Sequence, residues 1–173
     1  MKKIKTLLPA AVALVLTILL FLIFFADSNI ITRRSTDDFI TDSNGFYYET
    51  EQVAVGSFFT NIQGFCFNTS GLEEYYNFGT DMRGNAVYSH LSLCLVKDDS
   101  VYILPTVQQV REDILALPQA EAIKETPSYN FYAGTQSRFI TAFIPDGSYK
   151  TGFIYTDING LEYLLICDRE LVK

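Results

Sequence analysis

Hydrophobic residues form one uninterrupted segment near the start of the chain. Leu7 to Ala26 contains no charged residue, and its most polar member is Thr17. The segment holds about 20 residues, the length that an α-helix needs to cross a hydrocarbon core of roughly 30 Å. Pro9 is compatible with such a helix, because N–H groups in a first turn have no intrahelical partner. The pattern therefore predicts a membrane-spanning helix over residues 7–26.

Apolar residues then recur at every second position in short stretches of residues 45–173. This alternation is typical of β-strands that bury one face. Turn residues separate the stretches, and Asn159-Gly160 favours a type I′ hairpin because both residues tolerate positive φ. The predicted strands cover residues 45–57, 57–67, 87–96, 101–104, 138–144, 149–156 and 161–167.

Residues 106–124 depart from this alternation. Val107, Val110 and Ile114 recur at spacings of three and four residues, which is typical of one face of a helix. Thr106 is a candidate cap at the start, and Pro118 would end the segment. We expect one short helix or helical turn that crosses between sheets.

Short strands at regular intervals, with a single helix, predict a mainly β domain. The favoured fold is an Ig-like antiparallel β-sandwich, and a small barrel is the alternative. Residues 27–44 are polar and mixed in charge, which is typical of a stalk. The predicted organisation is therefore a cytoplasmic tip and signal-anchor helix in 1–26, a stalk in 27–44 and the sandwich in 45–173.

Charges beside the apolar segment predict its orientation. Lys2, Lys3 and Lys5 precede it, and positive charge tends to stay on the cytoplasmic side. We expect a single-pass protein of the cell membrane with its N-terminus inside and residues 27–173 outside. A cleaved signal peptide is the alternative, but Phe24-Phe25-Ala26 places an aromatic residue where a cleavage site has a small one.

The exported part is acidic. Three of the 13 basic residues precede the apolar segment and all 20 acidic residues follow it, so the remainder carries a net charge of −10. Binding to nucleic acid or to anionic lipid needs clustered positive charge, so we expect neither. The predicted partners are the membrane, through residues 7–26, and an envelope protein or glycan.

The chain has three cysteines and one histidine, which limits the thiol and metal chemistry that it can perform. Cys66, Cys94 and Cys167 lie within apolar strands, which favours buried free thiols over a single disulfide. No paired C-x-x-C spacing or second histidine is present, so we expect no metal site and no cofactor. His90 is the sole histidine.

His90 lies near Ser89 and Ser92, which raises the alternative of an extracytoplasmic hydrolase. Such a site needs an exposed nucleophile, a base and an orienting acid. Ser89 points away from His90 on a strand, and Cys94 lies about 13 Å along it at about 3.3 Å per residue. We therefore expect no catalytic residues and no enzyme activity.

Aromatic residues in a polar loop provide the predicted binding site. Tyr75, Tyr76 and Phe78 lie between Glu73 and Gly84. Exposed aromatic rings in loops stack on sugars or anchor protein partners. We expect a binding or assembly module at the bacterial cell envelope.

Several short motifs resemble those of extracytoplasmic Ig-like β-sandwich domains in membrane-bound surface proteins of Gram-positive bacteria. The resemblance implies the sandwich fold, an external location and no known catalytic role. Ser137-Arg138-Phe139 departs from the usual Gly-Phe, and Phe65 replaces the usual Trp. The matching motifs are Ile62-Gln63-Gly64-Phe65-Cys66-Phe67, Leu91 to Leu95 with Val101-Tyr102, Arg111-Glu112-Asp113-Ile114, and Gly147-Ser148-Tyr149-Lys150-Thr151-Gly152-Phe153-Ile154.

The same motifs have a physical interpretation that does not depend on the resemblance. Arg111 and Asp113 flank a single residue, so they could tie a crossover to the end of a strand. Gly147 fits a turn, and Gly152 fits a strand that another backbone approaches closely.

Overall fold

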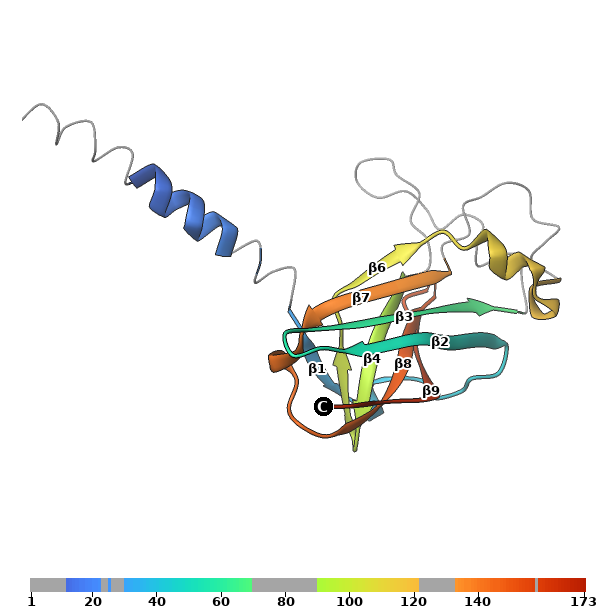
Figure 1. The fold of residues 1–173 in the computed structure, drawn as a ribbon. Helices are drawn as coiled ribbons and strands as arrows, with labels where there is room; N and C mark the ends of the chain where they lie inside the picture. Colours follow the sequence, from blue (N-terminus) through green and yellow to red (C-terminus); the bar gives the residue numbers. More distant parts are fainter. Residues whose placement is uncertain (1–11, 23–24, 26–29, 70–89, 122–132, 158) are drawn as a thin grey trace, which may run out of the picture. The chain divides into compact units, whose positions relative to one another are not determined.

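The structure is a computed structural model that describes residues 12–22, 25, 30–69, 90–121, 133–157 and 159–173 (Figure 1). The chain divides into two compact units, Met1–Ile30 and Ile31–Lys173. Each unit is considered by itself.

The first unit contains a helix over residues 12–22. The hydroxyl of Thr17 donates to the carbonyl of Ala13 at 2.9 Å, so the one polar side chain is satisfied within the helix. Within the described residues, no helix is both long enough and apolar enough to span a bilayer. Residues 7–11, 23, 24 and 26 of the predicted span lie outside the described residues, and the span stays a prediction.

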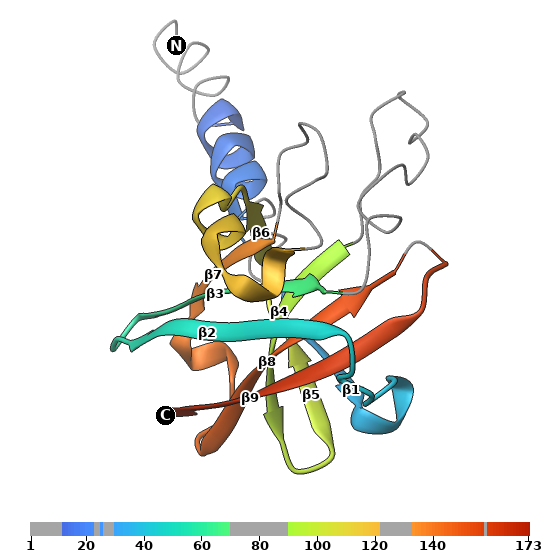
Figure 2. The ribbon, with the colours of Figure 1, turned by 90° about the vertical axis from the view of Figure 1, so that its right-hand side faces the viewer.

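The second unit consists of two antiparallel sheets, which confirms the mainly β prediction (Figure 2). The five-stranded sheet has the order β1-β5-β4-β8-β9, and the four-stranded sheet has the order β2-β3-β7-β6. The sheets pack as a sandwich whose strands cross at a steep angle. The strands are β1 (Thr32–Ser35), β2 (Phe46–Val55), β3 (Phe59–Asn68), β4 (His90–Lys97), β5 (Ser100–Ile103), β6 (Thr106–Gln109), β7 (Gly134–Ile140), β8 (Ser148–Thr156) and β9 (Glu162–Val172).

The main core lies between the sheets. Leu91, Leu93 and Leu95 alternate along β4 and point towards the four-stranded sheet, where they meet Ile62 and Phe139. This is the period of two that the sequence predicts, and burying such side chains stabilises the fold by about 1.5–3 kcal/mol each.

The outer face of the five-stranded sheet is also apolar. Cys94, Val96, Ile154 and Leu164 point away from the main core and are nevertheless buried. Phe39 covers them, because the chain crosses this face after β1.

The crossing segment joins the two edges of the five-stranded sheet. The short 3₁₀ helix η1 (Thr36–Asp38) follows β1, and Ile40 then pairs with Tyr163 of β9 in a parallel bridge. The guanidinium of Arg34 on β1 contacts Glu162 on β9 at 2.7 Å and stacks on the Phe39 ring at 4.3 Å.

This arrangement corrects the predicted stalk. Residues 31–44 belong to the compact domain, so the domain begins at Ile31 instead of residue 45. The sequence pattern misses β1 because an edge strand of Thr32-Arg33-Arg34-Ser35 is polar and too short to show alternation.

The crossover of residues 106–124 also differs from its prediction. Thr106–Gln109 form β6, and the expected short helix or helical turn occurs later in the segment as two 3₁₀ helices, η3 (Glu112–Ala116) and η4 (Pro118–Ala120). Thr106 caps no helix, because its hydroxyl accepts a hydrogen bond from the Leu93 N–H and donates to the Leu104 carbonyl, each at 2.9 Å. The helix-like spacing instead places Ile114 over the outer face of β3.

The β8–β9 connection is not a type I′ turn. Gly160 has positive φ (80°), and Asn159, the other residue of the predicted pair, does not. The carboxylate of Asp157 accepts hydrogen bonds from the N–H groups of Asn159 and Leu161, each at 2.8 Å. An aspartate-centred loop therefore takes the place of the predicted Asn-Gly turn.

Two glycines mark close approaches between packed elements, as predicted for Gly152. A Cβ atom on Gly152 would lie 2.7 Å from the Leu165 carbonyl oxygen. A Cβ on Gly64 would lie 2.4 Å from the Glu49 carbonyl oxygen and 2.9 Å from the ring of Phe153 in the opposite sheet. Gly64 thus makes room for Phe153 in the main core.

We predict that Gly64→Ala destabilises the domain by about 1–3 kcal/mol, because the added methyl group must displace backbone and a packed ring. Denaturant unfolding of the purified protein measures this change. Ser57→Ala, in the exposed turn before β3, is the control and should shift the free energy of unfolding by no more than about 0.5 kcal/mol. Equal stability of the two variants would contradict the proposed packing role.

Candidate functional site

Five amide side chains lie on the outer face of the four-stranded sheet. Strand register places Gln52, Gln63 and Gln136 directly opposite one another on β2, β3 and β7. Asn61 lies two residues from Gln63 on the same face of β3, and Gln109 is on β6. We call these five residues the amide face.

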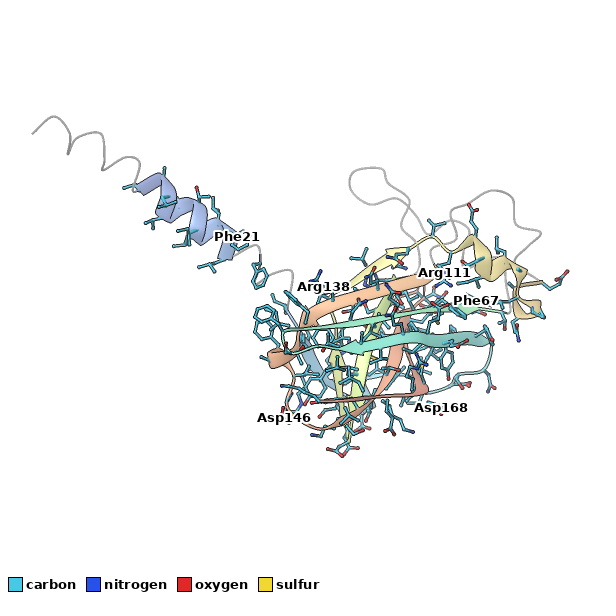
Figure 3. The ribbon with its side chains drawn as sticks, in the orientation of Figure 1. Phe21, Phe67, Arg111, Arg138, Asp146 and Asp168 are labelled. Carbon is cyan, nitrogen blue, oxygen red and sulfur yellow. The ribbon has the colours of Figure 1, made fainter. Side chains whose placement is uncertain are left out.

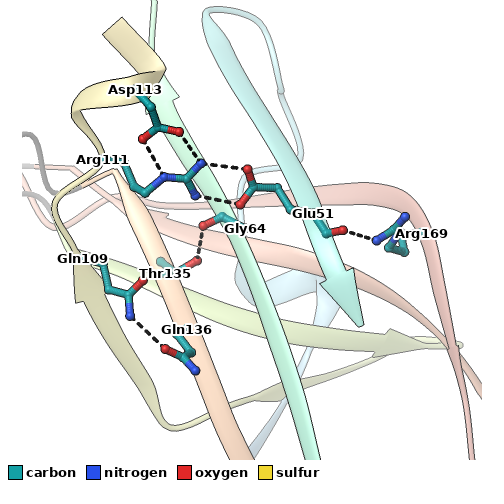
Figure 4. Close-up of polar contacts among 8 residues, drawn as sticks. All are labelled: Glu51, Gly64, Gln109, Arg111, Asp113, Thr135, Gln136 and Arg169. Carbon is teal, nitrogen blue, oxygen red and sulfur yellow. Dashed lines mark hydrogen bonds and ion pairs between the residues drawn. The ribbon is translucent and has the colours of Figure 1, made fainter. Parts of the chain in front are cut away.

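Hydrogen bonds connect three members of the amide face across three strands. The Gln109 amide nitrogen donates to the Gln136 amide oxygen at 2.8 Å (Figure 4). The Gln136 nitrogen in turn donates to the Asn61 oxygen at 3.3 Å. Each amide has two donors and an acceptor with two lone pairs, so this chain leaves hydrogen-bonding capacity for a ligand.

A shallow hollow adjoins one end of the amide face. It has a volume of about 400 Å³ and includes Phe59, Asn61, Gln136 and Arg138 in its lining. The guanidinium of Arg138 stacks over the Phe59 ring at 4.3 Å, which presents a flat cation above an aromatic side chain. Arg111 and Arg138 lie at the four-stranded sheet, away from Asp146 and Asp168 (Figure 3).

Arg111 fixes the other end of the face. Its guanidinium forms paired hydrogen bonds with Glu51 at 2.7 and 2.8 Å and with Asp113 at 2.8 and 2.7 Å (Figure 4). Hydrogen bonding to Arg111 lowers the pKa of the Asp113 carboxyl. Arg111 ties the crossover to β2, as the sequence motif predicted, and its charge is neutralised by these partners.

The crossover determines how much of the outer face stays open. Ile114 of η3 and Ala120 of η4 cover Phe65 and Phe67, the apolar half of β3. The polar half, which carries the amide face, has no such cover from the described crossover residues. The same sheet therefore has an apolar half that is buried and an amide-rich half that is accessible.

A second cleft, of about 640 Å³, lies between the edge strands β2 and β9. Its lining includes Tyr48, Thr50, Cys167 and Asp168. Arg169 of β9 donates a hydrogen bond to the Glu51 carbonyl and so joins the two edges (Figure 4). No group of three potential metal ligands occurs among the residues that the structure describes.

The cysteines are free and buried, which confirms the prediction of buried thiols. Burial raises the pKa of Cys66 well above its ordinary value and raises that of Cys94 strongly. Burial also raises the pKa of Cys167, although hydrogen bonds from Thr50 and Thr151 oppose this shift. Thiolate chemistry needs the opposite direction of shift, so these residues do not resemble reactive cysteines.

His90 does contact a serine. Its Nε2 atom lies 3.1 Å from the Ser92 hydroxyl, and both side chains project from the outer face of β4. Neither of the two clefts described above is lined by His90 or Ser92. Ser89 lies outside the described residues.

The sequence predicts a binding site of three aromatic residues. Tyr75, Tyr76 and Phe78 all lie outside the described residues. The amide face was not among the sequence predictions, although Gln52, Asn61 and Gln63 alternate with apolar residues. That alternation is a detectable signal, but only sheet register brings Gln136 and Gln109 beside them.

We predict that the three thiols of the folded protein resist modification. A thiol reagent such as dithionitrobenzoate should label fewer than one thiol per chain under native conditions and all three after denaturation, because burial excludes the reagent and disfavours the thiolate. Absorbance of the released thiolate measures the extent of reaction. Rapid labelling of a thiol in the folded protein would contradict this view of the cysteines.

Comparisons of the chain with protein-family models, curated proteins and solved structures found no match. The resemblance to Ig-like domains of bacterial surface proteins rests on the sequence motifs and stays a prediction.

Proposed function

We propose that the protein is a membrane-anchored binding module of the bacterial cell envelope, and that its exported β-sandwich holds a neutral glycan on the amide face. The observation that carries the proposal is the register of Gln52, Gln63 and Gln136 across three neighbouring strands. The side chains of these three glutamines are uncharged and share one open surface that can both donate and accept hydrogen bonds.

The chemistry of this surface suits hydroxyl and acetamido groups. Each glutamine can donate to one ligand group while it accepts from another, and the spacing of neighbouring strands is about 4.8 Å. Arg138 above Phe59 adds a flat surface at the end of the row. The acidic exported chain would repel nucleic acid or another polyanion. A neutral glycan experiences no such repulsion.

Membrane anchoring is supported by the helix over residues 12–22. Its large apolar side chains, among them Leu14, Leu20 and Phe21, are at least half exposed. A lipid environment would bury this apolar surface. Basic residues before the predicted span favour a cytoplasmic N-terminus and an extracytoplasmic domain. The preferred function is therefore binding at the outer side of the membrane, with no catalytic step.

A hydrolase with a site near His90 is the second candidate, and the hydrogen bond between His90 and Ser92 favours it. Serine hydrolysis also requires an acid that orients the base and donors that stabilise an oxyanion. No carboxylate contact to His90 occurs among the described residues. The His90–Ser92 contact therefore supplies only part of a catalytic arrangement.

Binding to the amide face can be tested with Gln63→Ala/Gln136→Ala in full-length protein held in lipid nanodiscs. We predict that binding to insoluble chitin and to cell-wall sacculi stripped of anionic polymers falls about tenfold, because each lost hydrogen bond contributes about 0.5–1.5 kcal/mol. Co-sedimentation at increasing glycan concentration measures the affinity.

The matched control is Gln119→Ala, which removes an exposed glutamine from η4, outside the amide face. It should bind as the unmodified protein does. If the double variant also retains full binding, the amide face is not a glycan site.

The hydrolase candidate predicts a different result. If the protein is a hydrolase, it should release nitrophenol from p-nitrophenyl acetate faster than the uncatalysed reaction does. Both His90→Ala and Ser92→Ala should then abolish this release. We expect no such activity in the unmodified protein. Activity that both substitutions abolish would favour the enzyme over the binding module.

A further inference from the structure

We infer that an apolar tip of the domain, formed by Val55, Phe58 and Phe143, inserts into the interface of the bilayer that anchors the chain. The inference rests on the membrane anchor in the proposed function and adds a second point of membrane contact. It implies that the sandwich lies against the membrane in a defined orientation.

The tip exposes large apolar side chains in an acidic domain. The exposed fractions are 60% for Phe58, 52% for Phe143 and 43% for Val55. No charged residue occurs between Gln52 and Gln63 or between Phe139 and Pro145. Arg138, which stacks on Phe59, is a charged residue beside the tip. Clusters of exposed aromatic residues with few charges are typical of surfaces that contact a membrane or a partner.

Hydrogen bonds hold the two loops of the tip together. The Thr141 N–H donates to the Phe58 carbonyl and the Thr141 hydroxyl donates to the Gly56 carbonyl, each at 2.9 Å. Thr141 begins η5 (Thr141–Phe143), so these bonds fix the β2–β3 turn to η5. The Phe58 and Phe59 rings also contact edge to face, with centroids 4.7 Å apart. The tip is thus built from two loops that are joined to each other.

The chain length between the anchor and the domain selects the bilayer as the partner. The predicted span ends at Ala26, and the compact domain begins at Ile31. Residues 27–30 reach at most about 14 Å even when fully extended. An 18-residue stalk would have let the domain move freely, but this short connection keeps the start of β1 beside the lipid headgroups.

The tip and the start of β1 lie on the same side of the domain. Figure 1 shows the β2–β3 turn, η5 and the start of β1 on that side, whereas η3 and η4 lie on the opposite side. The two ends of β3 lead to the same conclusion. Phe59 at its start adjoins the tip, and Phe67 near its end packs under η4. Phe59 and Phe67 are eight residues apart on β3, which is about 26 Å at about 3.3 Å per residue. A bilayer next to the start of β1 therefore faces the tip.

The net charge of the domain indicates which lipid headgroups it can approach. Its negative charge disfavours close approach to anionic headgroups, so we expect insertion into a zwitterionic surface through apolar contact. Phosphatidylcholine bilayers are consequently the appropriate probe.

The chain has no tryptophan, so a single introduced tryptophan reports its own environment. The test uses full-length Phe58→Trp in phosphatidylcholine nanodiscs, with Gln119→Trp on η4 as the matched control. We expect blue-shifted emission from Phe58→Trp and strong quenching when the lipids carry bromine in their acyl chains. Emission from Gln119→Trp should stay red-shifted and unquenched. Equal behaviour of the two variants would overturn the inference.

Two further measurements distinguish failure of the tip inference from failure of the proposed anchor. Phe143→Trp repeats the test from the other loop, and it replaces Phe58→Trp if that variant has a lowered unfolding midpoint. Retention of the unmodified chain in membranes washed with alkaline carbonate tests the anchor independently. Retention without quenching at the tip overturns only the tip inference, and loss from the washed membranes overturns both the anchor and the tip.

Discussion

Burial of both faces of the five-stranded sheet is the constraint on which the rest of the domain depends. Leu91, Leu93 and Leu95 face the main core, while Cys94 and Val96 face the opposite way and are buried as well. A sheet that is apolar on both faces needs a cover on each. The four-stranded sheet provides one cover, and Phe39 with its crossing segment provides the other.

The second cover has consequences beyond packing. It requires residues 31–44 to join the domain, so the segment that resembles a stalk becomes structural. The edges of the five-stranded sheet are joined through Ile40 and Tyr163, so the first residues of β9 already have a hydrogen-bonding neighbour. The connection to the predicted anchor is short as a result. The orientation that we propose for the domain at the membrane thus depends on how the sheet buries its outer face.

The four-stranded sheet shows the complementary situation. Its outer face is divided between Phe65 and Phe67, which the crossover covers, and the amide face, which it leaves open. Arg111 holds this division in place by linking the crossover to Glu51. Arg111 can be aligned in this way because Gly134 has no Cβ: one would lie 2.4 Å from the Arg111 side chain. The proposed binding surface therefore depends on a glycine that is not part of the amide face.

The sequence alone determines the fold class and most strands, because a period of two and the turn residues are local properties. It also determines the acidity of the chain after the apolar segment and the burial of the thiols. It misses β1, since a polar edge strand shows no alternation, and it misreads β6, where helical spacing occurs in a segment that pairs with the open edge of β7. Only the tertiary structure decides which strands are neighbours. The amide face and the apolar tip each combine residues far apart in the chain, and no local pattern encodes that contact.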